Sequence, residues 1–215
     1  MTAANAAAAV TARVALTVAS PPPAPWAYRD IGDYVLDERQ LGTYSAVAIR
    51  APGITSYDNG SFTVRGAGSD LNIINQGMTA QYAAVPVIGD HTITARIAGR
   101  DPGRAGLVMT KSLSPFDQLA GVVLTGDTSQ FVRRLRVATG LVTTEGVGAP
   151  TWLRLSRVGE VFSAETSADG QTWIALGEPA AIPGFSDAPY YAGLAVVSRD
   201  PFVLNTTVFD HVSIS

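Results

Sequence analysis

The sequence predicts an all-β protein built from antiparallel strands, arranged as a sandwich or barrel. Apolar and polar residues alternate with a period of two in one segment after another. Turn residues separate these segments at intervals of about 8 to 12 residues, and no stretch long enough for a helix has a helical period. The 21 Gly and 13 Pro among 215 residues agree with this prediction, because short strands need many tight turns.

Length and composition limit the domain count and the partners. A chain of 215 residues can bury one sizeable core, and all-β domains often reach this size as a single unit. Apolar residues make up 47% and charged residues 15%, which argues against disorder. The net charge of −3 gives no attraction to nucleic acid or anionic membranes. No apolar run approaches the roughly 20 residues of a membrane span, so we expect neither nucleic-acid binding nor membrane insertion.

The metal-binding and redox chemistry open to the chain is restricted. The sequence has no cysteine and two histidines, which excludes disulfides, thiolate zinc sites and a cysteine nucleophile. We therefore predict no metal site and no cofactor. Loop carboxylates at Asp58, Asp101, Asp127 and Asp200 are ligands that Ca²⁺ prefers. Because Asp before Gly or Pro usually forms turns, turn formation is the favoured interpretation, and loop-bound calcium is kept as an alternative.

The alternating segments locate the strands. We predict strands at 60–68, 90–99, 105–112, 119–126, 131–140, 151–159, 190–198 and 206–214. The runs 105–112 and 119–126 are almost continuously apolar, as in strands that are covered on both faces. Arg133, Arg134 and Arg136 fall on both faces of one strand, and we interpret them as solvated side chains rather than a phosphate site.

The stretch SADGQTW, residues 167–173, is one residue short of the sialidase Asp-box. A propeller would repeat that motif at blade spacing, and here it occurs once. Asp-Gly between alternating segments is a strong hairpin signal, and Ser167 and Asp169 can hydrogen-bond the turn backbone. We therefore predict a hairpin around Asp169–Gly170, with Trp173 and Leu176 buried after it.

The N-terminal residues form a separate unit in the predicted domain organisation. Val10, Val14, Leu16 and Val18 belong to an alternating apolar segment without the charged start of a signal peptide. Its apolar face needs a partner. We predict an isolated strand within residues 1–19, a stiff Pro-rich linker at 20–25 and a β-sandwich at 26–215. The strand is either a donor strand that completes a neighbouring sheet or the remnant of an upstream domain.

Motifs along the rest of the chain carry a resemblance to a known family. They are Trp26 with Asp30-Ile31-Gly32, then NGSFTVRGAGSD, GDHTITARI, AGLVMTKSLSP, WLRLSRVGEVFSAETSADGQTW, YYAGLAVVSRD and FDHVSIS. In this order they resemble the jelly-roll modules of the concanavalin A-like lectin/glucanase superfamily in secreted bacterial proteins. The N-terminal strand resembles the end of a bacterial immunoglobulin-like repeat. The resemblance implies a sandwich of two antiparallel sheets and a secreted or cell-surface location.

The glucanase chemistry of that superfamily is not visible in the sequence. Its retaining enzymes carry a Glu-x-Asp-x-x-Glu or similar pattern, and retaining hydrolysis needs two carboxylates about 5 to 5.5 Å apart. The five glutamates do not form such a pattern, and Asp169, the acid nearest to Glu165, belongs to a turn. A G-x-S-x-G nucleophile motif is also missing. We therefore expect no catalytic residues and a protein that is not an enzyme.

The expected function is that of an extracellular module for carbohydrate binding or adhesion. Sugars stack on aromatic rings, and the candidates are Tyr28, Tyr34, Tyr44, Tyr57, Tyr82, Tyr190 and Tyr191. We select Tyr34, Tyr44 and Tyr57 as the ligand-binding residues. One alternative is a structural subunit of a filament, surface layer or virion, forming a homo-oligomer through the N-terminal strand. A glycoside hydrolase is a second, disfavoured alternative. The expected partner is a glycan or a neighbouring protein subunit or domain.

Overall fold

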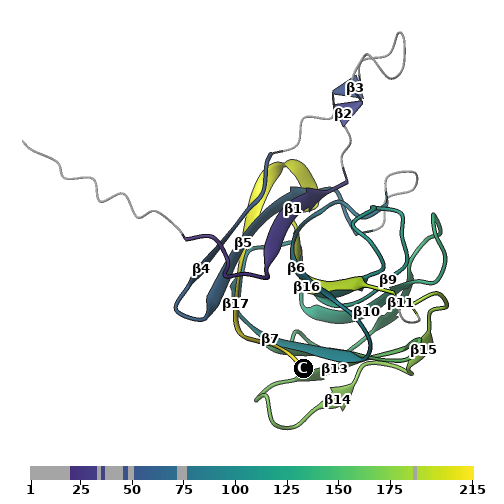
Figure 1. Ribbon diagram of the computed structural model, residues 1–215. Coiled ribbons are helices and arrows are strands. Elements are labelled where there is room, and N and C mark those ends of the chain that lie inside the picture. The colour runs from purple at the N-terminus through teal and green to yellow at the C-terminus, as the bar shows by residue number, and fades with distance from the viewer. Residues whose placement is uncertain (1–19, 33–34, 37–45, 48–50, 72–76, 186–187) are drawn as a thin grey trace, which may run out of the picture.

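The chain folds into two antiparallel sheets packed face to face (Figure 1). The computed structural model describes residues 20–32, 35–36, 46–47, 51–71, 77–185 and 188–215. All regular elements of this part are strands, which confirms the predicted all-β sandwich. None of the residues described forms a helix that could cross a membrane.

Fifteen of the strands build the two sheets. The seven-stranded sheet has the order β1 (Ala27–Ile31), β6 (Ala80–Val87), β16 (Tyr190–Val197), β8 (Arg104–Thr110), β9 (Leu119–Thr125), β10 (Thr128–Arg134), β11 (Val142–Glu145). The eight-stranded sheet has the order β14 (Ile174–Ala175), β13 (Val161–Ser167), β12 (Trp152–Val158), β7 (His91–Arg100), β17 (Asp200–Ile214), β5 (Ser61–Gly68), β4 (Ile54–Asp58), with β15 (Ala180–Ala181) paired to β13. β2 (Val35–Leu36) and β3 (Ala46–Val47) form a separate pair.

The main core lies between the sheets and follows from the period-two alternation. On β12, Leu153 and Leu155 are fully buried, while Trp152, Arg154 and Ser156 next to them are half-buried. Phe162 on β13 packs edge-on against Phe185, with 4.8 Å between the ring centroids. A residue every second position therefore faces the opposite sheet, which is the pattern that the sequence predicts.

A second apolar cluster covers the outer face of the seven-stranded sheet, the face turned away from the main core. Val108 and Val123 point outward from β8 and β9, yet both are fully buried. Leu71 and Met78, from the connection between β5 and β6, belong to the same cluster. Both faces of these strands are thus covered, which confirms the prediction made from their continuous apolar runs.

The basic cluster of β10 differs from the prediction of solvated side chains. Arg133 and Arg134 are only 7% and 1% exposed, and the strand ends at Arg134. Arg133 donates to the Thr144 hydroxyl, and burial lowers the pKa of both guanidinium groups. Only Arg136 is exposed. The prediction is wrong for the two buried residues because protein groups, rather than water, accept from them: the Thr144 hydroxyl on β11 for Arg133 and loop carbonyls for Arg134.

The SADGQTW stretch forms the predicted hairpin between β13 and β14. Asp169 Oδ1 accepts the N–H groups of Gln171 and Thr172, both at 2.8 Å. Gly170 adopts φ +77°, and a Cβ there would lie 2.7 Å from the Trp152 ring. Leu176 is buried as predicted. Trp173 is only half-buried, contrary to the prediction. Its ring lies outside the main core and stacks on the guanidinium of Arg154, 3.7 Å from the ring centroid.

Replacing Asp169 by asparagine is expected to make the free energy of unfolding depend less on pH in the acidic range. The Thr172 and Gln171 N–H groups hold the pKa of Asp169 at about 2, below its ordinary value of 3.8. The ionised carboxylate therefore stabilises the fold at pH values above 3.8. This contribution is lost as the pH falls from 3.8 toward 2. Urea unfolding between these pH values measures it. If the free energy of unfolding fell equally steeply with decreasing pH in the wild type and in Asp169→Asn, the role of Asp169 in the turn would be contradicted.

Several predictions fall on residues outside the described part of the chain. These are the assembly strand with Val10, Val14, Leu16 and Val18, and the loop residues Tyr34 and Tyr44. The Pro-rich stretch 20–25 is described. Pro22 is buried, and the Ser20 carbonyl accepts the N–H of Tyr57 at 2.8 Å on β4. The domain boundaries after residues 19 and 25, and assembly through a strand within residues 1–19, stay predictions.

Candidate functional site

A pocket of about 420 Å³ opens on the outer face of the seven-stranded sheet, over β1, β6 and β16. We call it the tyrosine pocket, and its lining residues are Pro25, Ala27, Tyr28, Arg29, Tyr82, Ala84, Pro86, Leu113 and Tyr191. The strand register brings them together, since Arg29 pairs with Tyr82 and Tyr191 pairs with Pro86. Its size lies within the range of small-ligand sites, about 300 to 1,000 Å³.

The floor of the tyrosine pocket is the buried ring of Tyr82, which is held by hydrogen bonds. The Tyr82 ring is 1% exposed, and its hydroxyl donates to the Val108 carbonyl at 2.9 Å, with the Tyr191 carbonyl at 3.2 Å. Desolvation raises the pKa of this hydroxyl well above its ordinary value. To reach β8 from β6 the ring must cross β16. It does so near Gly193, which pairs with both Ala84 and Val108 and has no side chain to obstruct it.

The walls of the tyrosine pocket combine aromatic surface with the guanidinium group of Arg29. Tyr28 is 40% exposed and Tyr191 is half-buried. Arg29 is exposed, and its guanidinium makes no hydrogen bond or ion pair with the residues that the structure describes. Exposed tyrosine rings and a free guanidinium can stack on a ligand and bind its oxygen atoms. The pocket can therefore hold a ligand that has both flat apolar faces and polar groups.

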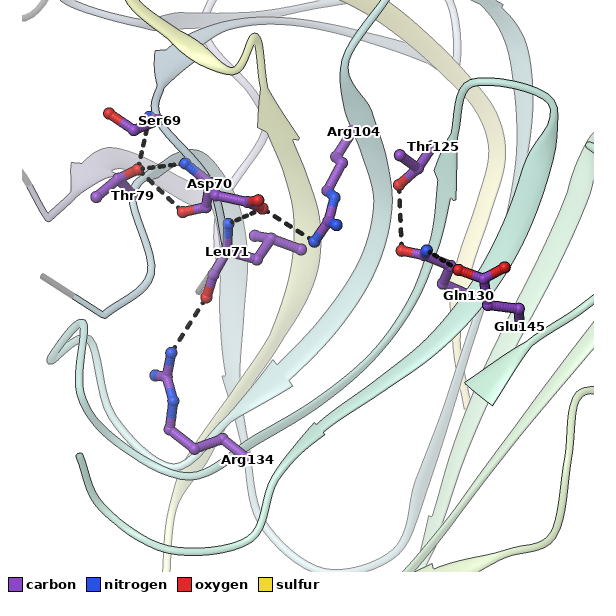
Figure 2. Close-up of polar contacts among 9 residues, drawn as sticks. All are labelled: Ser69, Asp70, Leu71, Thr79, Arg104, Thr125, Gln130, Arg134 and Glu145. Carbon is purple, nitrogen blue, oxygen red and sulfur yellow. Dashed lines mark hydrogen bonds and ion pairs between the residues drawn. The ribbon is translucent and has the colours of Figure 1, made fainter. Parts of the chain in front are cut away.

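The two described ends of the connection from β5 to β6 lie over the middle of this outer face (Figure 2). Asp70 forms an ion pair with Arg104 of β8 at 2.9 Å, and the Leu71 carbonyl accepts from Arg134 at 3.1 Å. Thr79 Oγ1 accepts the N–H groups of Ser69 and Asp70. These contacts fix the two described ends of the connection, so the tyrosine pocket is confined to one side of the face.

A polar row lies at the other side, over β9, β10 and β11 (Figure 2). Thr125 donates to the side-chain carbonyl of Gln130 at 3.3 Å, and Gln130 donates to Glu145 at 3.0 Å. Glu145 is exposed. The row thus places one carboxylate, that of Glu145, in a fixed orientation at the edge of the outer face of the seven-stranded sheet.

The predicted site residue Tyr57 lies elsewhere, on β4. Its ring packs against Phe62 at 4.9 Å between centroids, and it is half-buried. It lines a different, open pocket beside β17. Glu165, the strand glutamate nearest to another acid, pairs with Arg154 at 3.3 Å. The described residues contain no group of three or more His, Asp or Glu placed to hold a metal ion. Calcium binding stays an untested alternative.

Two of the three pocket tyrosines stand far apart in the sequence. Tyr82 lies on β6 and Tyr191 on β16, 109 positions later, and only the strand order makes them neighbours. The sequence marks both as candidate aromatic residues, but nothing in it separates them from the other five tyrosines. The one available signal is the nearly continuous run of apolar and small residues in β6 and β16, which places these rings on strands rather than in loops.

Solved structures share this fold at low sequence identity. A functionally unknown protein from Saccharomyces cerevisiae superposes with a TM-score of 0.59 at 14% identity, over 78% of this chain and 94% of that chain. A xylan β-1,4-xylosidase from Bacillus halodurans gives 0.53 at 12%, over 73% of this chain and 34% of the xylosidase. Alginate lyase A1-II', of polysaccharide lyase family 7, gives 0.52 at 10%, over 87% and 93%. No protein-family model and no curated protein matches the sequence.

The prediction that the chain is not an enzyme is contradicted by these neighbours, because two of them are enzymes. The missing Glu-x-Asp-x-x-Glu pattern speaks only against one type of hydrolysis. A lyase cleaves by elimination, which does not require a carboxylate pair. The absence of the pattern therefore does not separate enzymes of this fold from binding modules.

Proposed function

We propose that the protein is a carbohydrate-binding β-sandwich and that its glycan site is the tyrosine pocket. The observation that carries the proposal is the convergence of three tyrosines and an exposed arginine, unpaired among the described residues, on one pocket of about 420 Å³. The names of two structural neighbours, a xylosidase and an alginate lyase, support a carbohydrate ligand. We also place the protein outside the cell, where such modules of secreted bacterial proteins work.

The chemistry of the pocket matches the two kinds of surface that a sugar ring presents. The C–H faces of a pyranose are apolar and stack on aromatic rings, and its hydroxyl groups need donors and acceptors. Tyr28 and Tyr191 supply accessible ring surface, and Arg29 supplies donors that no described residue uses. Tyr82 is fixed by its hydrogen bonds, so the floor loses little freedom when a ligand binds.

Replacing Tyr191 by alanine is expected to weaken binding to a polysaccharide by about tenfold, because an aromatic contact contributes roughly 0.5 to 1.5 kcal/mol beyond the apolar area it buries. Soluble xylan and sodium alginate serve as the probes, and affinity electrophoresis or calorimetry measures binding. Tyr191→Phe keeps the ring and should retain most of the affinity. Phe202→Ala removes a 69% exposed ring outside the pocket and should have no effect.

Equal affinities of Tyr191→Ala and wild type would place the binding site elsewhere. Absence of binding to a broad glycan array, with the fold of the protein intact, would contradict the proposed function. Assaying the same samples for new reducing ends and for unsaturated products shows whether binding leads to cleavage.

A further inference from the structure

A β-bulge near the C-terminus places two polar side chains next to each other on the eight-stranded sheet. The register of β17 against β7 shifts between Asp210 and Ser213. Phe209 before the bulge and Val212 after it both pack on the main core, so Asp210 and His211 lie together on the outer side. His211 has φ +50°, a left-handed conformation that residues other than glycine rarely adopt. Such conformations concentrate at functional sites.

The charge and orientation of this pair are fixed by Arg96. The Arg96 guanidinium donates to both carboxylate oxygens of Asp210, at 2.7 and 2.5 Å. This hydrogen bonding holds the pKa of Asp210 at about 2, so the carboxylate is anionic at neutral pH. His211 Nδ1 lies 3.0 Å from Asp210 Oδ1. Because a carboxylate only accepts, the neutral imidazole carries its proton on Nδ1 and leaves the Nε2 lone pair for a ligand.

An open pocket of about 440 Å³ adjoins the pair, and we call it the bulge pocket. Its lining residues are Tyr57, Asn59, Gly60, Ser61, Phe62, Asp210, His211 and Val212. The register explains the polar part of this lining, since Phe209 pairs with Phe62 and Ser61 is therefore opposite Asp210. The side chain of His211 is 59% exposed. Its imidazole ring packs against the Trp152 ring, with 5.1 Å between the ring centroids.

We propose that the bulge pocket is a second ligand site, which takes one neutral sugar residue and makes the protein bivalent for glycans. Its class of ligand rests on the proposed function, while its location on the other sheet is independent of the tyrosine pocket. The imidazole Nε2 accepts a sugar hydroxyl, and the Ser61 and Asn59 side chains add donors and acceptors. Tyr57 lines the pocket from the core side, with its ring packed on Phe62. The free lone pairs of Asp210 complete a set suited to hydroxyl groups rather than to an anion.

Two features separate this site from an incidental surface hollow. Without the bulge, the alternation of β17 would turn His211 toward the core, and the imidazole could not meet Asp210 and the open pocket. In addition, the ion pair with Arg96 fixes the position of the Asp210 carboxylate, which can also accept a hydrogen bond from a ligand. The polar groups are therefore positioned before a ligand binds.

Imidazole ¹H–¹⁵N spectra of the full chain test the second site directly, because the sequence contains two histidines. Xylotriose, cellotriose and mannotriose are the probes. We expect at least one of them to shift the ring signals of His211 and the amide signals of Ser61 and Asn59. The His91 ring, which lies 3.3 Å from the Gly89 carbonyl and against Tyr190, is the internal reference and should not move.

Two variants complete the test. His211→Asn removes the imidazole and keeps a residue that tolerates the left-handed conformation, and Ser61→Ala removes one hydroxyl. Each should weaken the response at the bulge pocket by about tenfold, since a lost hydrogen bond is worth roughly 1 kcal/mol or more. Tyr191→Ala should leave this response unchanged.

Two results would overturn the inference. One is the absence of shifts at His211 and Ser61 with all three probes while Tyr28 and Tyr191 respond, which would leave the proposed function standing with a single site. The other is loss of the His211 response in Tyr191→Ala, which would mean that the two pockets are not separate sites. Absence of shifts at both pockets would count against the proposed function as well.

Discussion

Arg134→Met is expected to lower the free energy of unfolding by about 3 to 5 kcal/mol, because it breaks a buried network of charge-assisted hydrogen bonds. The guanidinium is 1% exposed. It donates to the carbonyl groups of Pro115, Asp117, Thr139 and Leu71 at 2.6 to 3.2 Å. Methionine fills much of the space but leaves these carbonyls without their donor. Because one of them belongs to Leu71, the substitution also loosens the connection that covers the outer face.

Urea unfolding followed by circular dichroism measures this loss. Arg136→Met is the matched control, since Arg136 belongs to the same basic cluster and is exposed, and it should change stability by less than about 0.5 kcal/mol. Arg134→Lys keeps the charge but offers fewer donors in a different geometry, and should recover only part of the loss. A loss below about 1 kcal/mol in Arg134→Met would show that the buried network contributes little.

Phe162→Ala should lower the free energy of unfolding by a similar amount, about 3 to 5 kcal/mol, because it opens a cavity in the main core. Phe162 is fully buried between the sheets and packs edge-on against Phe185, which in turn contacts Tyr190 of the opposite sheet. The alanine variant loses apolar contacts on both sides of the sandwich. Thermal and urea unfolding give the value.

The neighbouring position supplies the control for that experiment. Val161 is 44% exposed and lies on the opposite face of β13, so Val161→Ala should cost less than about 0.5 kcal/mol. Equal effects of the two substitutions would contradict the assignment of the inward and outward faces of this strand.

The strands were predictable because burial between two sheets imposes a period of two. The segments at 60–68, 90–99 and 151–159 closely match β5, β7 and β12. The continuous apolar run at 119–126 also correctly predicts that β9 is covered on both faces. In each case the pattern depends only on which side of a strand is covered, and that information is local.

The arginines of β10 show where local patterns fail. A buried guanidinium and a solvated one look alike in the sequence, and the difference lies in four carbonyl groups that loops bring to Arg134. The tyrosine pocket has the same origin, since Tyr28, Tyr82 and Tyr191 meet only through the order β1-β6-β16. The β17 bulge is a partial exception, because the Phe-Asp-His-Val stretch interrupts the alternation at the point where the register shifts.

The most direct test of the glycan site is a crystal structure of the protein with a bound oligosaccharide, using whichever of xylan or alginate fragments binds in solution. We expect a sugar ring stacked on Tyr191 or Tyr28, with its hydroxyl or carboxylate oxygens within hydrogen-bond distance of Arg29. The pocket walls should move little, because Tyr82 is already held by two carbonyls. A bound oligosaccharide elsewhere on the surface, with the tyrosine pocket empty, would contradict the proposed site.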